Sequence, residues 1–333
     1  MKGKNKYIYT PLKEPAPITE HVWPEGTLPL VHTRTMTYMH KDYIRDCIEG
    51  ILMQKTTFPV QVLIHEDAST DKTVEIVKEY EQKYPRLIKA YYQKENSYTK
   101  PDKIERLAEF NSWRIGKYEA ICEGDDYWTD PLKLQKQVDF LEKNPEYSMC
   151  FHFADVLYLT QQKDDLNLYK DLEEREYTAN EIIKKWTIPT ASVLFRTKFI
   201  NNIKQDPRFV FGDIVLFLSM TQCGKIYCLG DKMSVYRRHD SGILLSAYNE
   251  VSINVTIKLI KHYEAIKEHF FNIDEKIIIN SLEYRYVSLF FKSLRKLNFK
   301  GLFVSFRYMI MNPVLSFSNM LLFINRYLKK RKI

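Results

Sequence analysis

The ten residues 121–130, ICEGDDYWTD, constrain the fold of this chain more than any other stretch. The apolar residues that lead into them, such as Ala120, are typical of a buried strand. Acids follow the strand at once, and Asp130 with Pro131 then predicts the N-cap and first position of a helix over 132–143. A strand, an acidic loop and a helix in this order are typical of the edge at which an open α/β sheet binds its ligand.

The acidic loop consists of Glu123, Gly124, Asp125 and Asp126. Its carboxylates repel one another, and a divalent cation is the usual way to relieve such repulsion. A set of oxygen ligands favours Mg²⁺, Mn²⁺ or Ca²⁺ over Zn²⁺. The loop therefore predicts a metal site. The alternative is a solvated turn whose acids favour the N-terminus of the helix that follows.

Strand and helix patterns alternate along the first 245 residues. Short apolar runs bounded by turn residues predict strands, and apolar residues three and four apart predict helices. The predicted strands are 28–38, 60–64, 87–92, 118–122, 148–156, 190–195, 226–229 and 233–236. The predicted helices are 44–52, one around 74–80, 104–113, 132–143 and 213–220. This alternation predicts an α/β fold with a mainly parallel sheet flanked by helices.

The domain organisation follows from changes in this pattern. Four prolines mark residues 1–28 as an extended lead-in, and we place the α/β domain at 29–245. From about residue 252 the apolar periodicity becomes helical, so we expect a helical region at 246–333. A chain of 333 residues can bury a sizeable core as one large domain with such an appendage.

Cysteine usage and the first residues bear on the compartment. The five cysteines lack the spacing of a metal site, and two of them lie in apolar, strand-like runs, so we expect reduced thiols. The opening residues, MKGKNKYIYTPLKEPAP, contain no apolar signal core. Both observations predict a cytoplasmic protein.

The excess positive charge lies in the C-terminal part of the chain. Residues 284–333 contain 11 Lys and Arg and no Asp or Glu, and they are rich in large apolar residues. Such a segment favours binding to an anionic membrane surface, and we expect it to lie on the inner face of the plasma membrane. We expect no nucleic acid as a partner, because no base-stacking or groove-reading motif accompanies the basic residues. We expect helices that lie on the bilayer. A spanning helix over 308–325 and a helical cap on the α/β domain are the alternatives.

Two of the predicted strands end in acids, one at Asp67 and the other at the acidic loop. In a doubly wound sheet both ends open on one edge, where a nucleotide could bind. The chain has neither G-x-G-x-x-G nor G-x-x-x-x-G-K-[ST], so phosphates would need a metal and basic side chains. Asp125 together with Arg238 and His239 would meet that need.

Several motifs together resemble the family 2 glycosyltransferases with the GT-A fold. They are Thr37-Tyr38, HEDASTDKT at 65–73, EGDDYWTDPLKLQKQVDF at 123–140, Gly-Asp at 212–213 and YRRH at 236–239. The resemblance covers roughly residues 31–242, and its middle block is specific. It implies an inverting sugar transfer from a nucleotide diphosphate sugar, most often a UDP-sugar, to a hydroxyl of a glycan or lipid-linked acceptor.

The resemblance also implies which residues bind the donor nucleotide. Thr37 and Tyr38 would line the pocket of the base, and Asp67 would accept a hydrogen bond from the base. Glu123-Gly124-Asp125 stands where the family has its D-x-D motif, so Glu123 would approach the ribose.

The metal and the reaction itself are assigned by the same resemblance. Asp125 would bind Mn²⁺ or Mg²⁺, and Arg238 with His239 would hold the diphosphate or the metal. Asp213 would be the general base, because a partly desolvated carboxylate gains basicity. Each has a structural alternative: Asp213 as an acid favoured by its helix dipole, Asp67 as a turn residue and His239 as an ordinary histidine.

The chain departs from the family pattern at three positions. Met39 stands where the family usually has Asn after the Thr-Tyr pair, Met36 where it has Pro before the pair, and Glu109 near a place that often carries Arg. These departures concern the base pocket and the phosphate contacts. They leave open a second hypothesis, a non-catalytic binding module with the same fold at the membrane surface.

Overall fold

The structure of the protein, a computed structural model, describes residues 7–98, 100, 102–159, 169–185, 187–240 and 253–311. The chain forms two compact units that interleave along the sequence. The first comprises Met1–Thr178, Trp186–Asn202 and Cys223–Arg238, and the second Ala179–Lys185, Ile203–Gln222 and His239–Ile333. The boundary expected near residue 245 lies outside the described residues.

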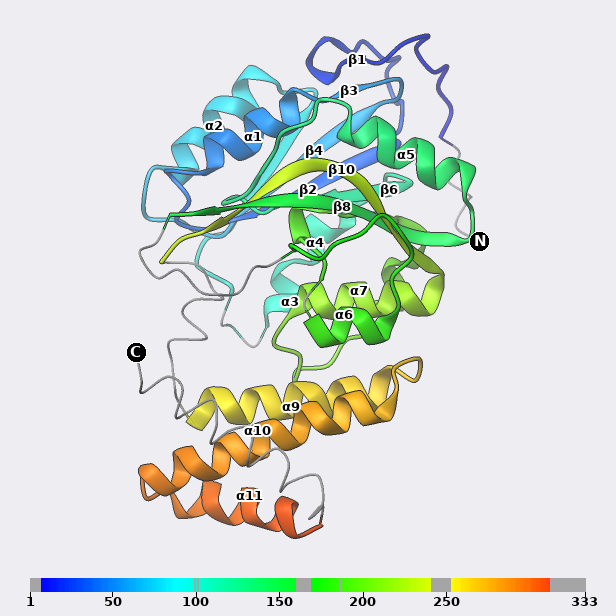
Figure 1. The fold of residues 1–333 in the computed structure, drawn as a ribbon. Coiled ribbons are helices and arrows are strands. Elements are labelled where there is room, and N and C mark those ends of the chain that lie inside the picture. The colour runs from blue at the N-terminus through cyan, green and yellow to red at the C-terminus, as the bar shows by residue number, and fades with distance from the viewer. Residues whose placement is uncertain are drawn as a thin grey trace. The chain divides into compact units, whose positions relative to one another are not determined.

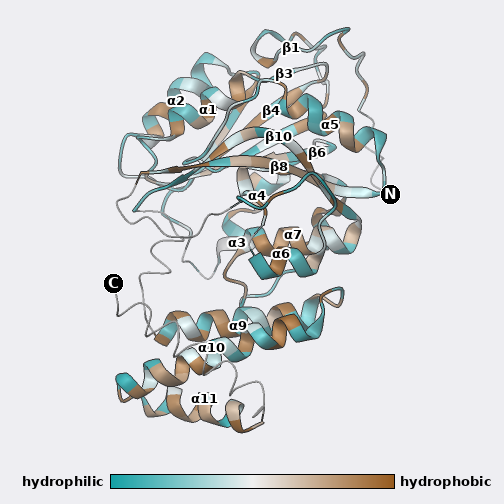
Figure 2. Ribbon diagram, viewed as in Figure 1, coloured by the Kyte–Doolittle hydropathy of each residue, from teal (hydrophilic) through white to brown (hydrophobic). Residues whose placement is uncertain are grey.

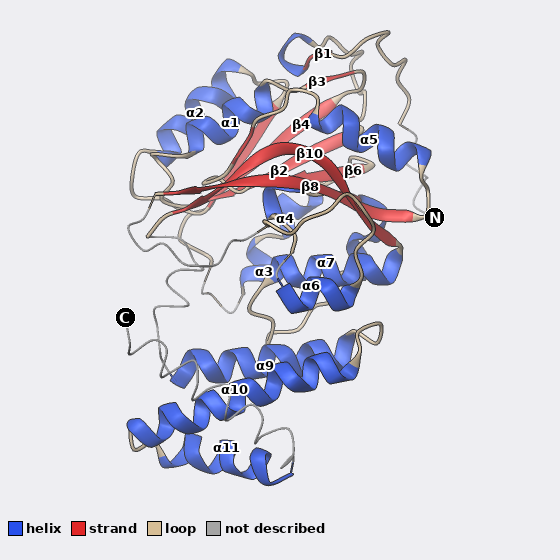
Figure 3. Cartoon of the chain, in the orientation of Figure 1, coloured by secondary structure: helices blue, strands red, loops and turns tan. Residues whose placement is uncertain are grey.

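The first unit is built on a large sheet, whose strands Figure 3 draws in red. The sheet has eight strands in the order β5-β4-β2-β6-β9-β8-β10-β7. Its strands are β2 (Val31–Thr37), β4 (Val60–Glu66), β5 (Ile88–Tyr92), β6 (Tyr118–Ile121), β7 (Tyr127–Trp128), β8 (Tyr147–Tyr158), β9 (Leu194–Arg196) and β10 (Lys225–Arg238). β9 runs antiparallel to both β6 and β8, and β7 runs antiparallel to β10, while the other pairs are parallel. A second sheet of two strands pairs β1 (Ala16–Pro17) with β3 (Lys55–Thr56). The predicted α/β class with a mainly parallel sheet is confirmed.

Helices cover both faces of the sheet (Figure 1). α1 (Ile44–Leu52), α2 (Thr73–Lys83) and α5 (Lys133–Lys143) lie on one face, and the short α3 (Lys103–Arg106) and α4 (Ala108–Ser112) lie on the other. The alternation of β4 shows how both faces are filled. Val62 and Ile64 belong to the large core beneath α1 and α2, whereas Leu63 packs with Leu107 and Phe110 on the opposite face. The 3-10 helices η1 (Ile18–Glu20), η2 (Thr190–Ser192) and η3 (Thr197–Asn202) also belong to the described part of this unit.

Two predicted elements are broken in the structure. The helix predicted at 104–113 is the pair α3 and α4, because such short helices gain little from their own hydrogen bonds and follow the burial of Leu107 and Phe110 instead. The strand predicted at 190–195 begins as the turn η2, in which the Ser192 hydroxyl donates to the Pro189 carbonyl at 2.6 Å. Only its end joins the sheet, as β9.

Two other predictions needed a change of bounds. The strands predicted at 226–229 and 233–236 are one strand, β10, whose register against β8 shifts between Leu229 and Lys232. The irregularity lets the strand bend without ending. α5 begins at Lys133, one residue later than predicted, and Asp130 instead accepts the Leu132 N–H in the preceding turn at 2.7 Å.

The second unit is helical. It contains α6 (Ala179–Lys185), α7 (Gly212–Cys223), α9 (Ile253–His269), α10 (Glu275–Arg295) and α11 (Phe299–Met311). α9 begins where the helical periodicity was predicted to begin. None of the helices in the described part of the chain is long and apolar enough to cross a membrane. The stretch 308–325, considered as a possible span, lies outside the described residues from position 312 onward.

Candidate functional site

The carboxyl ends of β4 and β6 lie on either side of the end of β2. The Asp67 N–H donates to the Thr37 carbonyl at 3.0 Å, and the Gly124 N–H donates to the Met36 carbonyl at 3.0 Å. Both bonds follow from the parallel pairing of β2 with its two neighbours. The loop after β4 and the acidic loop after β6 therefore open on one edge of the sheet, as a nucleotide site between them requires.

The acidic loop brings three carboxylates together. Oxygen atoms of Glu123, Asp125 and Asp126 lie within 4.8 Å of one another. Asp126 is fully buried, and burial together with the charges of Asp125 and Glu123 raises its pKa well above the usual value. No described residue donates a hydrogen bond to Asp126 Oδ2. A cluster of oxygen ligands with one buried, unsatisfied carboxylate oxygen fits a hard divalent cation.

Arg237 fastens the acidic loop to the end of β10. Its backbone N–H donates to Asp126 Oδ1 at 2.9 Å, and its Nη1 donates to the Asp125 carbonyl at 3.0 Å. Its Nη2 is paired with Asp46 of α1, and its guanidinium lies 4.3 Å from the centroid of the Tyr127 ring. One buried guanidinium thus joins α1, the acidic loop and β10, and it keeps the backbone of the loop in one place.

His40, which follows β2, reaches the acidic loop from the other side. Its Nε2 lies 3.9 Å from Asp125 Oδ2, and its Nδ1 lies 3.2 Å from Thr37 Oγ1. The His40 N–H donates to Thr73 Oγ1 at 2.9 Å, which ties the residue to the start of α2. A Cβ at position 124 would lie 2.7 Å from both His40 Nδ1 and Thr37 Oγ1, so only glycine fits there.

Asp67 follows β4 and lies beside the end of β2. Its Oδ1 accepts hydrogen bonds from the Ser97 N–H at 2.9 Å and from the Ser97 hydroxyl at 2.7 Å. The side chain is 7% exposed, whereas Tyr38 is 42% exposed. An aromatic ring open to solvent and a buried carboxylate at the same strand edge are groups that could bind a planar base.

Met39 adopts a backbone conformation that explains the usual preference for Asn at this position. Its φ is 59°, in the left-handed region that Asn tolerates better than most residues. Its N–H donates to Ser69 Oγ at 2.9 Å, and its sulfur accepts hydrogen bonds from the Thr70 N–H and hydroxyl at 3.4 Å. The turn is therefore preserved with a methionine in it.

The remaining predicted residues lie at the end of β10 and in the second unit. Arg238 is the last residue of β10 and is 4% exposed. His239 follows it and is also 4% exposed. Asp213 lies in the first turn of α7, where its Oδ1 accepts the Ile214 N–H at 2.8 Å. His239 and Asp213 belong to the second unit, and their roles stay predictions.

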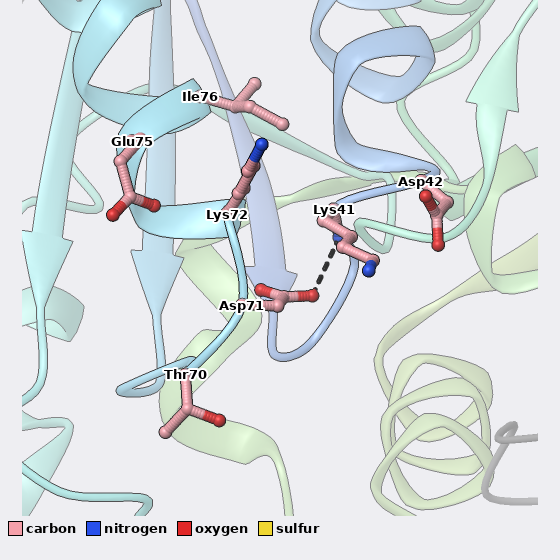
Figure 4. A pocket seen from close by; sticks show the side chains of 7 residues that line it. All are labelled: Lys41, Asp42, Thr70, Asp71, Lys72, Glu75 and Ile76. Atoms are coloured by element: carbon pink, nitrogen blue, oxygen red, sulfur yellow. Dashed lines mark hydrogen bonds between the residues drawn. The ribbon is translucent and has the colours of Figure 1, made fainter.

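A cavity of about 480 Å³ opens near the start of α2 (Figure 4). It is lined by Lys41, Asp42, Thr70, Asp71, Lys72, Glu75 and Ile76. Asp71 accepts the Lys41 N–H at 3.1 Å and the Thr73 N–H at 2.9 Å, so this carboxylate serves the turn and the start of the helix. The residues predicted to bind a nucleotide do not line this cavity.

Sequence reasoning missed three residues of this edge, His40, Ser97 and Arg237, and it placed Asp126 in the acidic loop without giving it a role of its own. The Arg237-Arg238 pair was a usable signal. No sequence pattern indicated that Arg237 would contact the acidic loop. Ser97 and His40 come from segments without any motif of their own.

Comparison with known proteins gives a match at the level of a family. The family model described as Glycosyl transferase family 2 matches residues 35–202, which is about half of the chain. An uncharacterized protein of Mycobacterium tuberculosis strain H37Rv is 37% identical over 218 residues, which cover 65% of this chain and 61% of that protein. The chain thus matches about three fifths of that relative's length.

Solved structures give matches at the level of the fold. The structure of Staphylococcus aureus TarS 1–349 with UDP has a TM-score of 0.53 at 17% identity, covering 78% of this chain and 71% of that one. The mannosyltransferase PcManGT from Pyrobaculum calidifontis, with GDP-Man and Mn²⁺, has a TM-score of 0.52 at 14% identity, covering 92% of this chain and 87% of that one. These likenesses support the GT-A architecture predicted for the sheet and its helices.

Proposed function

The chain belongs to glycosyl transferase family 2, and from this membership we propose that it transfers a sugar from a nucleotide diphosphate sugar, a UDP-sugar, to an acceptor hydroxyl. The observation that carries the proposal is the edge of the sheet at which Asp67 and the acidic loop flank the end of β2. The solved neighbours, one with UDP and one with GDP-Man and Mn²⁺, support a nucleotide-sugar donor and a divalent cation. A glycan or lipid-linked acceptor at the inner membrane surface completes the proposal.

In this proposal the edge of the sheet binds the donor nucleotide. Tyr38 and Thr37 contact the base, and Asp67, held by Ser97, accepts a hydrogen bond from it. Glu123 reaches the ribose from the start of the acidic loop. Because Asp67 and the loop are both fastened to β2, the nucleotide meets groups that are already in place.

The acidic loop is the proposed metal site. Asp125, supported by Glu123 and Asp126, would hold Mn²⁺ or Mg²⁺, with His239 as a further ligand. The cation, when bound, would neutralise the charge that develops on the departing diphosphate. Arg237 keeps the loop in position through the Asp125 carbonyl and the Asp126 carboxylate.

The proposed reaction is a single displacement at the anomeric carbon. Asp213 accepts the proton of the acceptor hydroxyl while the new C–O bond forms, and the bond from the sugar to the diphosphate breaks on the opposite side. Configuration is inverted because one displacement occurs. Arg238 contributes positive charge toward the diphosphate.

The test compares three proteins in a transfer or donor-hydrolysis assay with Mn²⁺. We expect Asp125→Ala to lose metal-dependent nucleotide binding, because a central oxygen ligand is removed. We expect Asp213→Asn to bind nucleotide normally and to turn over about 10²–10⁴-fold more slowly, the range of a missing general base. Asp139→Ala, an exposed acid on α5, is the control and should match the wild type. Equal activity of all the proteins would contradict the proposal.

A further inference from the structure

The outward face of α11 carries a stripe of large apolar side chains. Phe299, Phe303, Phe306 and Ile310 are 78%, 68%, 53% and 62% exposed. Their spacing of four, three and four residues places them on one face of the helix. Figure 2 shows apolar residues along this helix. The stripe is therefore continuous along the length of α11.

The opposite face of α11 packs on α10 through the small residues Gly301 and Ser305 and through Tyr308, whose ring stacks on that of Tyr286 at 3.8 Å between centroids. Gly301 and Ser305 are the buried residues of the helix. A Cβ at position 301 would collide with the Ser293 hydroxyl of α10, so the two helices approach each other through glycine. Ser305 Oγ donates to the Gly301 carbonyl at 2.6 Å, which satisfies the hydroxyl inside the contact. Such small residues four apart are typical of close helix contacts in membranes.

This arrangement inverts the usual pattern of a helix in water. A surface helix of a water-soluble domain buries its large apolar residues and exposes polar ones. Here the three phenylalanines alone expose on the order of 400 Å² of apolar surface, judged from the area of a phenylalanine side chain. An area of that order equals the largest apolar patch of a typical soluble monomer, and such a patch is often functional. Leu297, which is two residues before the helix, is also 72% exposed.

The charges beside the stripe indicate the chemistry of its partner. Lys300 and Arg307 lie seven residues apart on α11, and Arg295 and Lys296 precede it. No Asp or Glu occurs anywhere in residues 284–333. A cationic border around an apolar stripe is complementary to an anionic bilayer, where each Lys or Arg near the surface contributes about 1 kcal/mol. A second copy of the chain would bring the same cations face to face, which is unfavourable.

We propose that the face of α11 formed by Phe299, Phe303, Phe306 and Ile310 inserts into the interface of a bilayer that contains anionic phospholipids. Lys300 and Arg307 then contact the headgroups. The inference rests on the membrane location in the proposed function and names the surface that provides it. It requires neither donor nor acceptor, so it can fail or succeed separately from the transferase activity.

The test uses the full chain and sedimentation with phosphatidylcholine vesicles, with and without phosphatidylserine. We expect binding only when phosphatidylserine is present, and weaker binding as salt is added. The double substitution Phe303→Ser and Phe306→Ser should weaken binding about a hundredfold, because two large apolar groups are lost. The double substitution Lys300→Gln and Arg307→Gln should weaken it about thirtyfold.

Matched controls lie elsewhere in the second unit. Phe271→Ser removes an apolar side chain that is 86% exposed, and Lys258→Gln with Lys261→Gln removes two exposed cations of α9. Both controls should bind vesicles as the wild type does. All variants change exposed residues, and equal thermal melting will verify that they fold.

Several outcomes would overturn the proposal. Unchanged vesicle binding by the Phe303→Ser, Phe306→Ser protein would mean that another surface binds the membrane. A dimer in solution that this substitution dissociates, without any vesicle binding, would assign the stripe to a second copy. Binding to single-stranded nucleic acid but not to vesicles would assign the cations to that ligand. Vesicle binding by a protein without transferase activity would leave this proposal intact and contradict only the proposed function.

Discussion

At Asp126 a carboxylate is buried beside two others, an arrangement that opposes folding while no cation is present. Its Oδ1 is satisfied by the Arg237 N–H, which recovers part of the lost hydration. The guanidinium of Arg237 donates to the backbone carbonyl of Asp125, not to the Asp125 carboxylate. The residues thus retain a local charge imbalance that a bound cation would correct.

A second buried ionisable residue, Lys133, lies at the start of α5. It is fully buried, its Nζ donates to Gln137 Oε1 at 2.8 Å, and the same atom lies 3.9 Å from the centroid of the Trp128 ring. Burial lowers the pKa of Lys133 to about 7. The native protein therefore holds this lysine near the midpoint of its titration at neutral pH.

The pKa of Lys133 predicts how Lys133→Met changes the dependence of stability on pH. In the unfolded chain the lysine keeps a pKa near 10.4, so between pH 7 and about 10 the unfolded state binds one more proton. Burial of the lysine therefore lowers the free energy of unfolding of the wild type most below pH 7. Above pH 7 this loss of stability becomes smaller by about 1.4 kcal/mol per pH unit. We therefore expect the free energy of unfolding of Lys133→Met, minus that of the wild type, to fall by about 1.4 kcal/mol for each pH unit between pH 7 and about 10.

The measurement for Lys133 is urea denaturation of both proteins from pH 6 to pH 10, where the difference between them cancels the other titrating groups. Loss of the hydrogen bond to Gln137 changes the difference in free energy of unfolding between the two proteins by the same amount at every pH, so it does not alter the slope. Lys143→Met, an exposed lysine at the end of the same helix, should show no such slope. A pH-independent difference for Lys133→Met would contradict a depressed pKa.

At the scale of elements, the site depends on how closely the loop after β6 approaches β2. The Gly124 N–H bonds to the Met36 carbonyl, and the side chains of Thr37 and His40 fill the space beside its Cα. The strand and the loop therefore meet without a side chain between them. Arg237 then fixes the far side of the loop to β10.

Gly124→Ala tests this close approach. The added methyl group would lie 2.7 Å from Thr37 Oγ1 and His40 Nδ1, so we expect a loss of about 1–3 kcal/mol in the free energy of unfolding. We also expect weaker metal-dependent nucleotide binding, because Asp125 moves with its neighbour. Denaturant unfolding and Mn²⁺ titration measure the two effects.

Gly212→Ala is the matched control for Gly124→Ala. Position 212 opens α7 with no atom within 4 Å of an added Cβ, so alanine there should stabilise the protein by about 0.5–1 kcal/mol. Equal effects of the two substitutions on stability would contradict the steric account of Gly124.

At the scale of the whole molecule, the two units divide the predicted site residues between them. Asp67, Asp125 and Arg238, which are proposed to bind the donor, belong to the first unit, while Asp213 and His239 belong to the second. A ligand that binds the native state stabilises it by mass action whichever unit it contacts. Ligand-dependent melting of the intact protein therefore tests the proposed nucleotide site.

We expect Mn²⁺ with UDP to raise the melting temperature of the full chain. At a ligand concentration a hundred times the dissociation constant, the free energy of unfolding rises by about 2.7 kcal/mol, which corresponds to a rise of about 4 °C in the melting temperature of a chain of this length. A chelator should reverse the rise, and Asp125→Ala should not show it. An equal rise in the melting temperature of Asp125→Ala would contradict a metal site in the acidic loop. So would a rise with UDP that persists after the chelator is added.

Much of the fold could be predicted because strands and helices are specified by short-range patterns. The stripe Ile44, Cys47, Ile48 and Ile51 is fully buried in α1, as its spacing predicts. Misplaced bounds occur where pairing between distant segments prevails, as in β9 and β10. Family membership agreed with the resemblance of the middle block, whose motifs are contiguous in the sequence.

The sequence by itself determined the α/β class, the acidic loop between a strand and a helix, and the basic, apolar C-terminal region. Each of these is a property of neighbouring residues. Only the tertiary structure decided that Arg237 contacts the acidic loop, that His40 approaches Asp125, and that α11 buries glycine and serine while exposing phenylalanine. Such contacts depend on strand order and helix packing, because they join residues as far as 112 positions apart, and no local pattern specifies them.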